Sequence, residues 1–204
     1  INTAERKFWI EKVKDDAILG VLDFGIEQHL NRYESWRYDA LSPKNALIFG
    51  VGLLAASNIP GTHRLIFCAR SPLWQGFFTS TMGGAGFVFC GLNINFVVIE
   101  GCSHVPLIVK IINDNENVKV SFERVEKEKL FTIYGDYKGK RGVYALQQYV
   151  VDRMGKEFLT KKIPFRVLAV GPAAFNTKYG AICSTVTTGF NFVEGIDEWA
   201  GRGG

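Results

Sequence analysis

The sequence predicts an α+β fold built from a duplicated unit, in which one amphipathic helix is followed by several antiparallel strands. Apolar residues recur at helical spacing in two separate stretches, and short apolar segments follow each of them. Glycines behind the two stretches are in register, because 119 residues separate Gly52 from Gly171 and also Gly61 from Gly180. We therefore expect a single domain, residues 1–204, whose two halves form two packed β-sheets.

The first half begins with an expected edge strand and a helix. Alternation over residues 7–13 predicts the strand, and Asp15 and Asp16 are suited to cap a helix over residues 16–33. The apolar stripe of this helix comprises Ile18, Leu22, Ile26 and Leu30, with Val21 and Gly25 beside it. Short apolar runs then predict strands at residues 46–49, 63–69 and 95–99.

The second half begins after a predicted hairpin, residues 106–112 and 118–122, closed over a polar loop. The charged run at residues 123–129 indicates a solvated face. A second helix is expected over residues 142–157, with Val143, Leu146, Val150 and Met154 on one side. Two further strands are expected at residues 165–170 and 181–187.

Residues 79–86 form the most distinctive stretch, reading Thr-Ser-Thr-Met-Gly-Gly-Ala-Gly. Gly83, Gly84 and Gly86 let backbone amides approach a ligand without an intervening Cβ. Successive exposed N–H groups in such a turn, or in a first helical turn, can bind an anion. The alternative is a tight turn that leads into a buried helix.

Charge supports an anionic ligand. Residues 40–99 and 158–193 contain no Asp or Glu, yet the first segment holds Arg64 and Arg70 and the second holds Arg166. Such segments suit a polyanion such as a phosphorylated cofactor. Avoidance of charge by buried strands would explain the missing acids but not the arginines. The net charge of +4 is modest, and no Lys/Arg-rich run interleaved with aromatics indicates nucleic acid.

Several other functions are disfavoured. Gly50-Val-Gly52-Leu-Leu-Ala55 matches a dinucleotide fingerprint, but Pro60 interrupts the helix that should follow and the ribose-binding acid is missing. The four cysteines lack metal-ligand spacing, the three histidines share no such spacing either, and we expect His29 to be a packed or surface residue. No nucleophile elbow is present. No apolar stretch is long enough to span a membrane and no signal peptide is evident, so we expect a cytosolic chain.

The chain resembles the N-terminal domain of the tungsten-containing aldehyde ferredoxin oxidoreductases over most of its length. The segments that carry the resemblance are Leu41-Ser-Pro-Lys-Asn45, Pro60-Gly-Thr-His-Arg64, Arg70-Ser-Pro-Leu73, Gly83-Gly84, Val97-Val-Ile-Glu-Gly101, Gly171-Pro-Ala173 with Asn176, and Ala200-Gly-Arg-Gly-Gly204. The glyceraldehyde-3-phosphate branch is the most similar, through Gly61-Thr-His-Arg64, Ser80-Thr-Met-Gly-Gly-Ala85 and Glu198-Trp-Ala200.

The resemblance implies a sheet base that binds a tungstopterin, a bis-molybdopterin cofactor holding tungsten or molybdenum. Arg64 falls where the family has a pterin-contacting arginine, and the other contacts come from Thr81, Met82, Gly83, Gly84 and Ala85 and from Ala200, Gly201, Arg202 and Gly203. Main-chain carbonyls of these two loops help to hold a magnesium ion that bridges the pterin phosphates. Some relatives have Asn near Thr81 or Met82, so a side-chain contact does not carry over there.

The resemblance also implies partners. The cysteines of the family's [4Fe–4S] cluster lie in later domains, so we expect the chain to be a fragment that is inactive alone. With those domains, the enzyme would oxidise an aldehyde to a carboxylic acid and pass electrons to ferredoxin; a homodimer is left open. The alternatives are a non-catalytic, stand-alone module that binds a pterin or phosphate ligand, and a degenerate structural remnant.

Overall fold

The computed structural model describes residues 1–14, 17–115, 117–188 and 191–200. Within these ranges the strands are β1 (Leu47–Gly50), β2 (Leu65–Arg70), β3 (Phe77–Met82), β4 (Phe96–Ile99), β5 (Leu107–Asp114), β6 (Asn117–Arg124), β7 (Leu168–Ala169), β8 (Cys183–Thr188) and β9 (Asn191–Trp199). They pair antiparallel in three sheets, with the orders β3-β2-β1-β4, β5-β6 and β7-β8-β9. The predicted α+β class is therefore confirmed.

Helices pack around these sheets and, in the case of α2, between them. The α-helices are α1 (Val21–Glu27), α2 (Ala85–Cys90), α3 (Lys127–Gly135), α4 (Gly142–Val150), α5 (Lys156–Thr160) and α6 (Ala173–Asn176). A π-helical segment, Gln28–Arg32, continues α1, and another, Val151–Gly155, joins α4 to α5. Among the described residues, no helix is long and apolar enough to cross a membrane.

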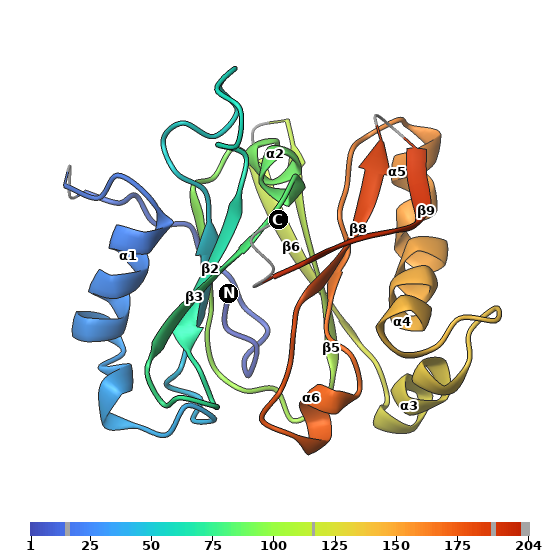
Figure 1. Cartoon of the computed structure of the whole chain (residues 1–204), viewed down its shortest axis with the longest axis horizontal. Helices are drawn as coiled ribbons and strands as arrows, with labels where there is room; N and C mark the ends of the chain where they lie inside the picture. The colour runs from blue at the N-terminus through green and yellow to red at the C-terminus, as the bar shows by residue number, and fades with distance from the viewer. Residues whose placement is uncertain (15–16, 116, 189–190, 201–204) are drawn as a thin grey trace.

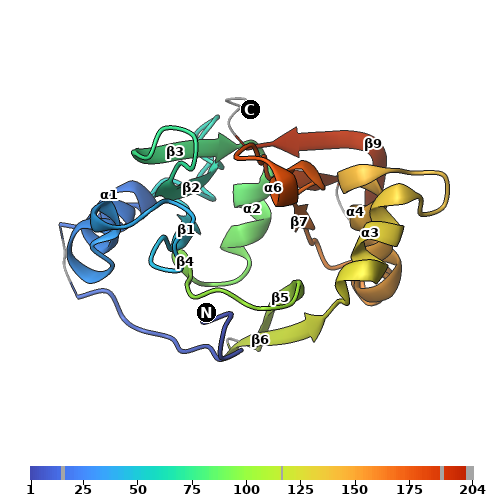
Figure 2. The same cartoon turned by 90° about the horizontal axis from the view of Figure 1, so that it is seen from below.

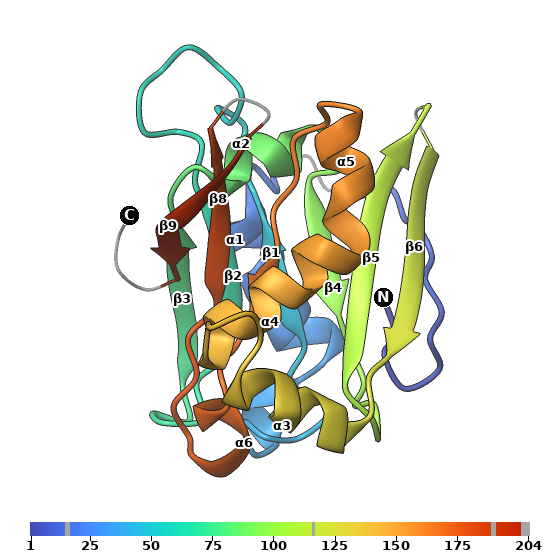
Figure 3. The same ribbon diagram turned by 90° about the vertical axis from the view of Figure 1, so that its right-hand side faces the viewer.

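Two sheets pack against one core between the helices. Figure 1 shows α1 on one outer side, α4 and α5 on the other, and the sheets β1–β4 and β7–β9 between them. Phe49, Leu65 and Phe67 of the four-stranded sheet are buried in a cluster that Leu168 and Ile182 also join. The expected pair of packed sheets is thus present, and the β5–β6 hairpin lies beside α4 and α5 (Figure 3).

The buried face of α1 differs from the predicted stripe. Leu22, Ile26 and Leu30 are 42%, 40% and 53% exposed, whereas Val21 and Gly25 are buried on the other face. Gly25 lets the helix approach β2 closely, since a Cβ there would lie 2.9 Å from Cβ of Cys68. Sequence periodicity finds the helix, but the small residue decides which face approaches the sheet.

His29 continues the buried face of α1. It is 3% exposed, and its Nδ1 lies 2.8 Å from Oγ of Ser35. The expected packed histidine is confirmed. Burial lowers the pKa of His29, so the neutral form is favoured in the folded protein.

Several predicted boundaries were wrong. Residues 7–13 form no regular strand, and the first helix begins at Val21 rather than near residue 16. The charged run at 123–129 leads into α3, and Val125 within it is 4% exposed. The strand expected at residues 165–170 shrinks to the two residues of β7. Sequence analysis also missed β3, β9, α3 and α6. The strands β3 and β9 and the short helix α6 show no clear apolar period, and α3 begins within the charged run.

The two halves follow one order of elements. A helix with a π-helical segment precedes three consecutive strands in each half, β1–β3 and β7–β9. Their registers are similar but not identical: Gly50 pairs with Ile66, and Leu168 and Ser184, which are 118 positions later, also pair, one position short of the 119 residues that separate the glycines.

The first of the recurring glycines also has a similar neighbourhood in both halves. Gly52 bridges Gly20, the N-cap of α1, and Gly171 lies next to Val143 in the first turn of α4. These contacts support the duplicated unit that the sequence suggested.

Candidate functional site

The glycine-rich stretch lies where the two units meet. Thr81 and Met82 end β3, Gly83 and Gly84 form the turn, and Ala85 begins α2. Figure 2 shows β3 and β9 running toward each other from opposite sides, with α2 between the two sheets. The loop after β3 and the residues that end β9 are therefore neighbours, although more than a hundred positions separate them in the sequence.

The anion bound by the turn is a carboxylate of the protein itself. The Gly84 N–H donates to Oε1 of Glu198 at 2.8 Å, and the Ala85 N–H donates to Oε2 at 3.2 Å. Glu198 stands near the end of β9, in the other unit. Successive amides in this turn do form an anion-binding pair, as predicted, but in this structure Glu198 occupies it.

Arg166, which precedes β7 in the chain by two residues, completes the cluster. Its Nη1 lies 3.5 Å from Oε2 of Glu198 and donates to the carbonyl of Thr185 in β8. The side chains of Arg166 and Glu198 are 10% and 22% exposed, so this ion pair is largely shielded from water. Burial lowers the pKa of Arg166, and the Glu198 carboxylate opposes that shift by stabilising the cation.

The carboxylate also accounts for the double glycine. A Cβ on Gly83 would lie 2.9 Å from Oε1 of Glu198. A Cβ on Gly84 would lie 3.3 Å from both that oxygen and Nη2 of Arg166. Gly84 has a φ of −64°, which any residue can adopt, so space rather than backbone conformation requires the glycine.

Arg64 lies beside the same turn. It directly precedes Leu65, which pairs with Met82, so its backbone is next to the end of β3. Gly86 allows this arrangement, because a Cβ there would lie 2.7 Å from the carbonyl carbon of Arg64. Arg64 is half-buried, and no hydrogen bond or ion pair joins its guanidinium to another described residue.

The other predicted site residues divide into three groups. Met82 and Ala85 are 0% and 2% exposed as whole residues, so they belong to the core and expose almost no atoms to a ligand in this structure. Thr81 is half-buried, and Ala200 packs against the same core cluster as Met82. Gly201, Arg202 and Gly203 lie outside the described residues.

Sequence reasoning missed Glu198 and Arg166 as parts of this site. Arg166 was noted only as a cation in an acid-free segment, and Glu198 only as part of a branch-specific motif. The available signal was an arginine in an otherwise acid-free half, followed by an acid just before the second glycine-rich loop. The contact between Arg166 and Glu198 could not be predicted without knowing how the two sheets pack.

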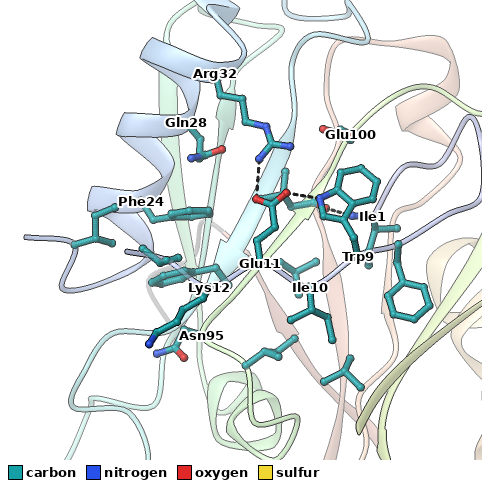
Figure 4. Close-up of a pocket in the computed structure, with 18 of the residues that line it drawn as sticks. Ile1, Trp9, Ile10, Glu11, Lys12, Phe24, Gln28, Arg32, Asn95 and Glu100 are labelled. Carbon is teal, nitrogen blue, oxygen red and sulfur yellow. Dashed lines mark hydrogen bonds and ion pairs between the residues drawn. The ribbon is translucent and has the colours of Figure 1, made fainter. Parts of the chain in front are cut away.

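A separate cavity of about 840 Å³ lies between the N-terminal segment, α1 and β4. Figure 4 shows Glu11 inside it, accepting hydrogen bonds from Nε1 of Trp9 at 2.7 Å and from Nη1 of Arg32 at 3.2 Å. Glu100 at its rim accepts a hydrogen bond from the Tyr33 hydroxyl at 2.5 Å. Each of these three charged side chains, Glu11, Arg32 and Glu100, has a hydrogen-bond partner, which suits a structural cluster better than a reactive one.

No group of three or more His, Cys, Asp or Glu side chains suited to a metal ion occurs in the described parts of the chain. The described residues of the site provide one guanidinium at Arg64, the glycine-rich turn, and a carboxylate–arginine pair behind it.

Comparison with solved structures identifies a related fold. The chain is similar to part of the active site complex BamBC of benzoyl coenzyme A reductase in complex with 1,5-dienoyl-CoA, with a TM-score of 0.63. The match covers 99% of this chain and 27% of that one at 21% sequence identity. At this identity the likeness concerns the fold alone.

Sequence relatives are longer proteins. The glyceraldehyde-3-phosphate:ferredoxin oxidoreductase of Pyrococcus furiosus is 45% identical over 175 residues, which is 86% of this chain and 26% of that protein. An uncharacterized protein of Methanocaldococcus jannaschii, MJ1185, is 37% identical over the whole chain and 29% of its own length. The chain thus spans little more than a quarter of these relatives.

The family model for the aldehyde ferredoxin oxidoreductase N-terminal domain matches residues 1–204. The match covers every element described above, including both loops of the site. By this full-length match and the identity to the Pyrococcus enzyme, the chain belongs to the aldehyde ferredoxin oxidoreductase family.

Proposed function

We propose that the chain is the cofactor-binding N-terminal domain of a longer aldehyde:ferredoxin oxidoreductase that uses a tungsten or molybdenum bis-pterin. The observation that carries the proposal is the meeting of the glycine-rich turn with the end of β9 beside Arg64, an arginine without a partner among the described residues. Membership of the family and the length of the relatives support it.

The residues fit a phosphorylated cofactor in three respects. Arg64 offers a forked cation suited to phosphate oxygens. Met82 and Ala85 are held in the core, so their side chains would not obstruct a ligand beside the half-buried Gly83 and Gly84. Because Glu198 already engages the N–H groups of Gly84 and Ala85, the turn would contribute mainly carbonyl oxygens, which are suitable ligands for magnesium.

In the proposed enzyme, the metal and pterin would supply the oxidation of an aldehyde to a carboxylic acid, with the added oxygen atom taken from water and two protons and two electrons released. The electrons would leave singly through a [4Fe–4S] cluster held by later domains, with ferredoxin as acceptor. This chain's own residues would bind and orient the cofactor, the usual task of protein groups around a redox cofactor. The name of the Pyrococcus relative favours glyceraldehyde 3-phosphate as the aldehyde.

Purification of the protein at its full natural length, from cells supplied with tungstate and molybdate, tests the proposal. We expect about one metal atom and two pterins per chain, and reduction of an artificial electron acceptor with glyceraldehyde 3-phosphate in preference to unphosphorylated aldehydes. A metal- and pterin-free protein would contradict the proposal and favour a stand-alone binding module of another kind.

The 204-residue chain alone provides a second test. Since it lacks a cluster-binding cysteine set and a general acid–base constellation, we expect no aldehyde oxidation above background. Turnover by this chain would show that the chemistry does not need later domains.

A further inference from the structure

We propose that Glu198 and Arg166 are positioning residues that clamp the turn Gly83–Ala85 to the end of β9, so that the turn is held in one orientation beside the ligand. This inference rests on the proposed cofactor-binding function. In this role the two residues do not contact the ligand themselves and do more than fill the core, because they fix the position of the turn.

The first step is the bridge between the units. One carboxylate accepts from two consecutive amides, Gly84 at 2.8 Å and Ala85 at 3.2 Å, and its own backbone belongs to β9. A charged acceptor makes each of these hydrogen bonds stronger than a neutral pair. Because two bonds meet one side chain, the turn is fixed in orientation as well as in distance.

The second step is the anchoring of the carboxylate. Arg166 lies 3.5 Å from Glu198 and also donates to the carbonyl of Thr185, which ties it to β8. Charges this well shielded persist in a protein only when they are paired and hydrogen-bonded. A continuous chain of polar contacts therefore runs from β8 through Arg166 and Glu198 to the start of α2.

The third step is the fit of the turn around the clamp. Gly83 and Gly84 leave room for the carboxylate, and Ala200, two residues after Glu198, packs into the core cluster that holds Met82 and Ala85. The residue that carries the clamp thus lies two positions before a residue of the shared core. Any shift of Glu198 would move the turn relative to the end of β9.

The test uses the full-length protein with Glu198→Gln, which keeps the side-chain shape but removes the charge and one acceptor oxygen. Hydrogen–deuterium exchange of the peptide containing Gly84 and Ala85, in protein grown without tungstate or molybdate, reports on the clamp directly. We expect these amides to exchange about tenfold faster or more, the scale of losing a hydrogen bond to a charged group. Metal and pterin content should fall by a similar factor at limiting cofactor.

Glu157→Gln is the matched control, because Glu157 forms an exposed ion pair with Lys161 far along the chain from both loops. It should change neither exchange nor cofactor content. Glu198→Asp, which retains the carboxylate, should restore part of the cofactor content, a rescue that a purely space-filling role would not produce. If Glu198→Gln fails to fold, Gly83→Ala displaces the carboxylate without deleting a polar group and should give the same two effects.

Two outcomes would overturn the inference. Wild-type exchange and cofactor content in Glu198→Gln would remove any positioning role. A higher cofactor content in Glu198→Gln would instead make the carboxylate a competitor of the ligand's phosphates. A wild-type protein without metal or pterin would refute the proposed function, whereas the exchange measurement would still decide whether the clamp exists.

Discussion

The first unit, from α1 to β3, and the second, from α4 to β9, share their order of elements but differ in how they use an arginine. In the first unit, Arg64 stands beside the glycine turn with no partner among the described residues. In the second, Arg166 is shielded and held by Glu198 and Thr185. The two units therefore place their arginines differently: Arg64 has no partner among the described residues, whereas Arg166 stabilises the junction between the units.

The largest expected effect is a difference in folding stability between variants of Arg166 and Arg64. Arg166→Met should lower the free energy of unfolding by about 3–5 kcal/mol, because it leaves the partly buried Glu198 without its cation. Arg64→Met, the matched change in the first unit, should stay within about 0.5 kcal/mol. Denaturant unfolding of the cofactor-free protein measures both, and equal losses would contradict the division of roles.

Gly86 should be the next most sensitive position. Gly86→Ala would place a Cβ 2.5 Å from the carbonyl oxygen of His63, a backbone atom that cannot move aside easily. We expect a loss of about 3 kcal/mol, at the upper end of ordinary overpacking. Gly76→Ala is the control, since nothing lies within 4 Å of its added Cβ. A thermal unfolding midpoint for Gly86→Ala equal to that of the control would show that α2 can shift away from β2.

Arg64 should matter for cofactor binding rather than for stability. Arg64→Ala should weaken binding of the proposed cofactor by about 1.5–3 kcal/mol, the scale of hydrogen bonds to a charged group. Arg64→Lys should recover only part, because lysine lacks the planar fork. Metal and pterin content of the full-length protein provides the measurement, and unchanged content in Arg64→Ala would exclude a role in binding.

The smallest effect concerns the thiols of the two units. Burial raises the pKa of Cys68 in β2 and of Cys183 in β8 to about 11. At pH 8 iodoacetamide should therefore modify the exposed Cys102 first, which mass spectrometry can detect. The raised pKa favours the neutral form of each buried thiol in the folded protein. The contribution of these thiols to the free energy of unfolding is therefore complete below about pH 9 and is lost as the pH rises through 11. Modification of Cys68 as fast as Cys102 would indicate local opening of the first unit.

The sequence by itself determined features whose causes are local. The α+β class, the β5–β6 hairpin and the paired glycines follow from periodicity and turn chemistry within short stretches. The glycine-rich turn was also located, because Gly83 and Gly84 stand directly between a strand and an apolar helix. These features need no knowledge of what packs against them.

Only the tertiary structure decided which groups those elements meet. Gly25, rather than the larger apolar residues, set the buried face of α1. The close approach of the helix to the sheet, which only a small residue allows, decides this face, and the number of apolar residues in the stripe does not. The partner of the turn, Glu198, lies 114 residues from Gly84. No local sequence pattern links these two residues. The packing of two sheets around one core places the carboxylate beside the amides. The same packing holds Arg166 at the junction, whereas Arg64 has no partner among the described residues.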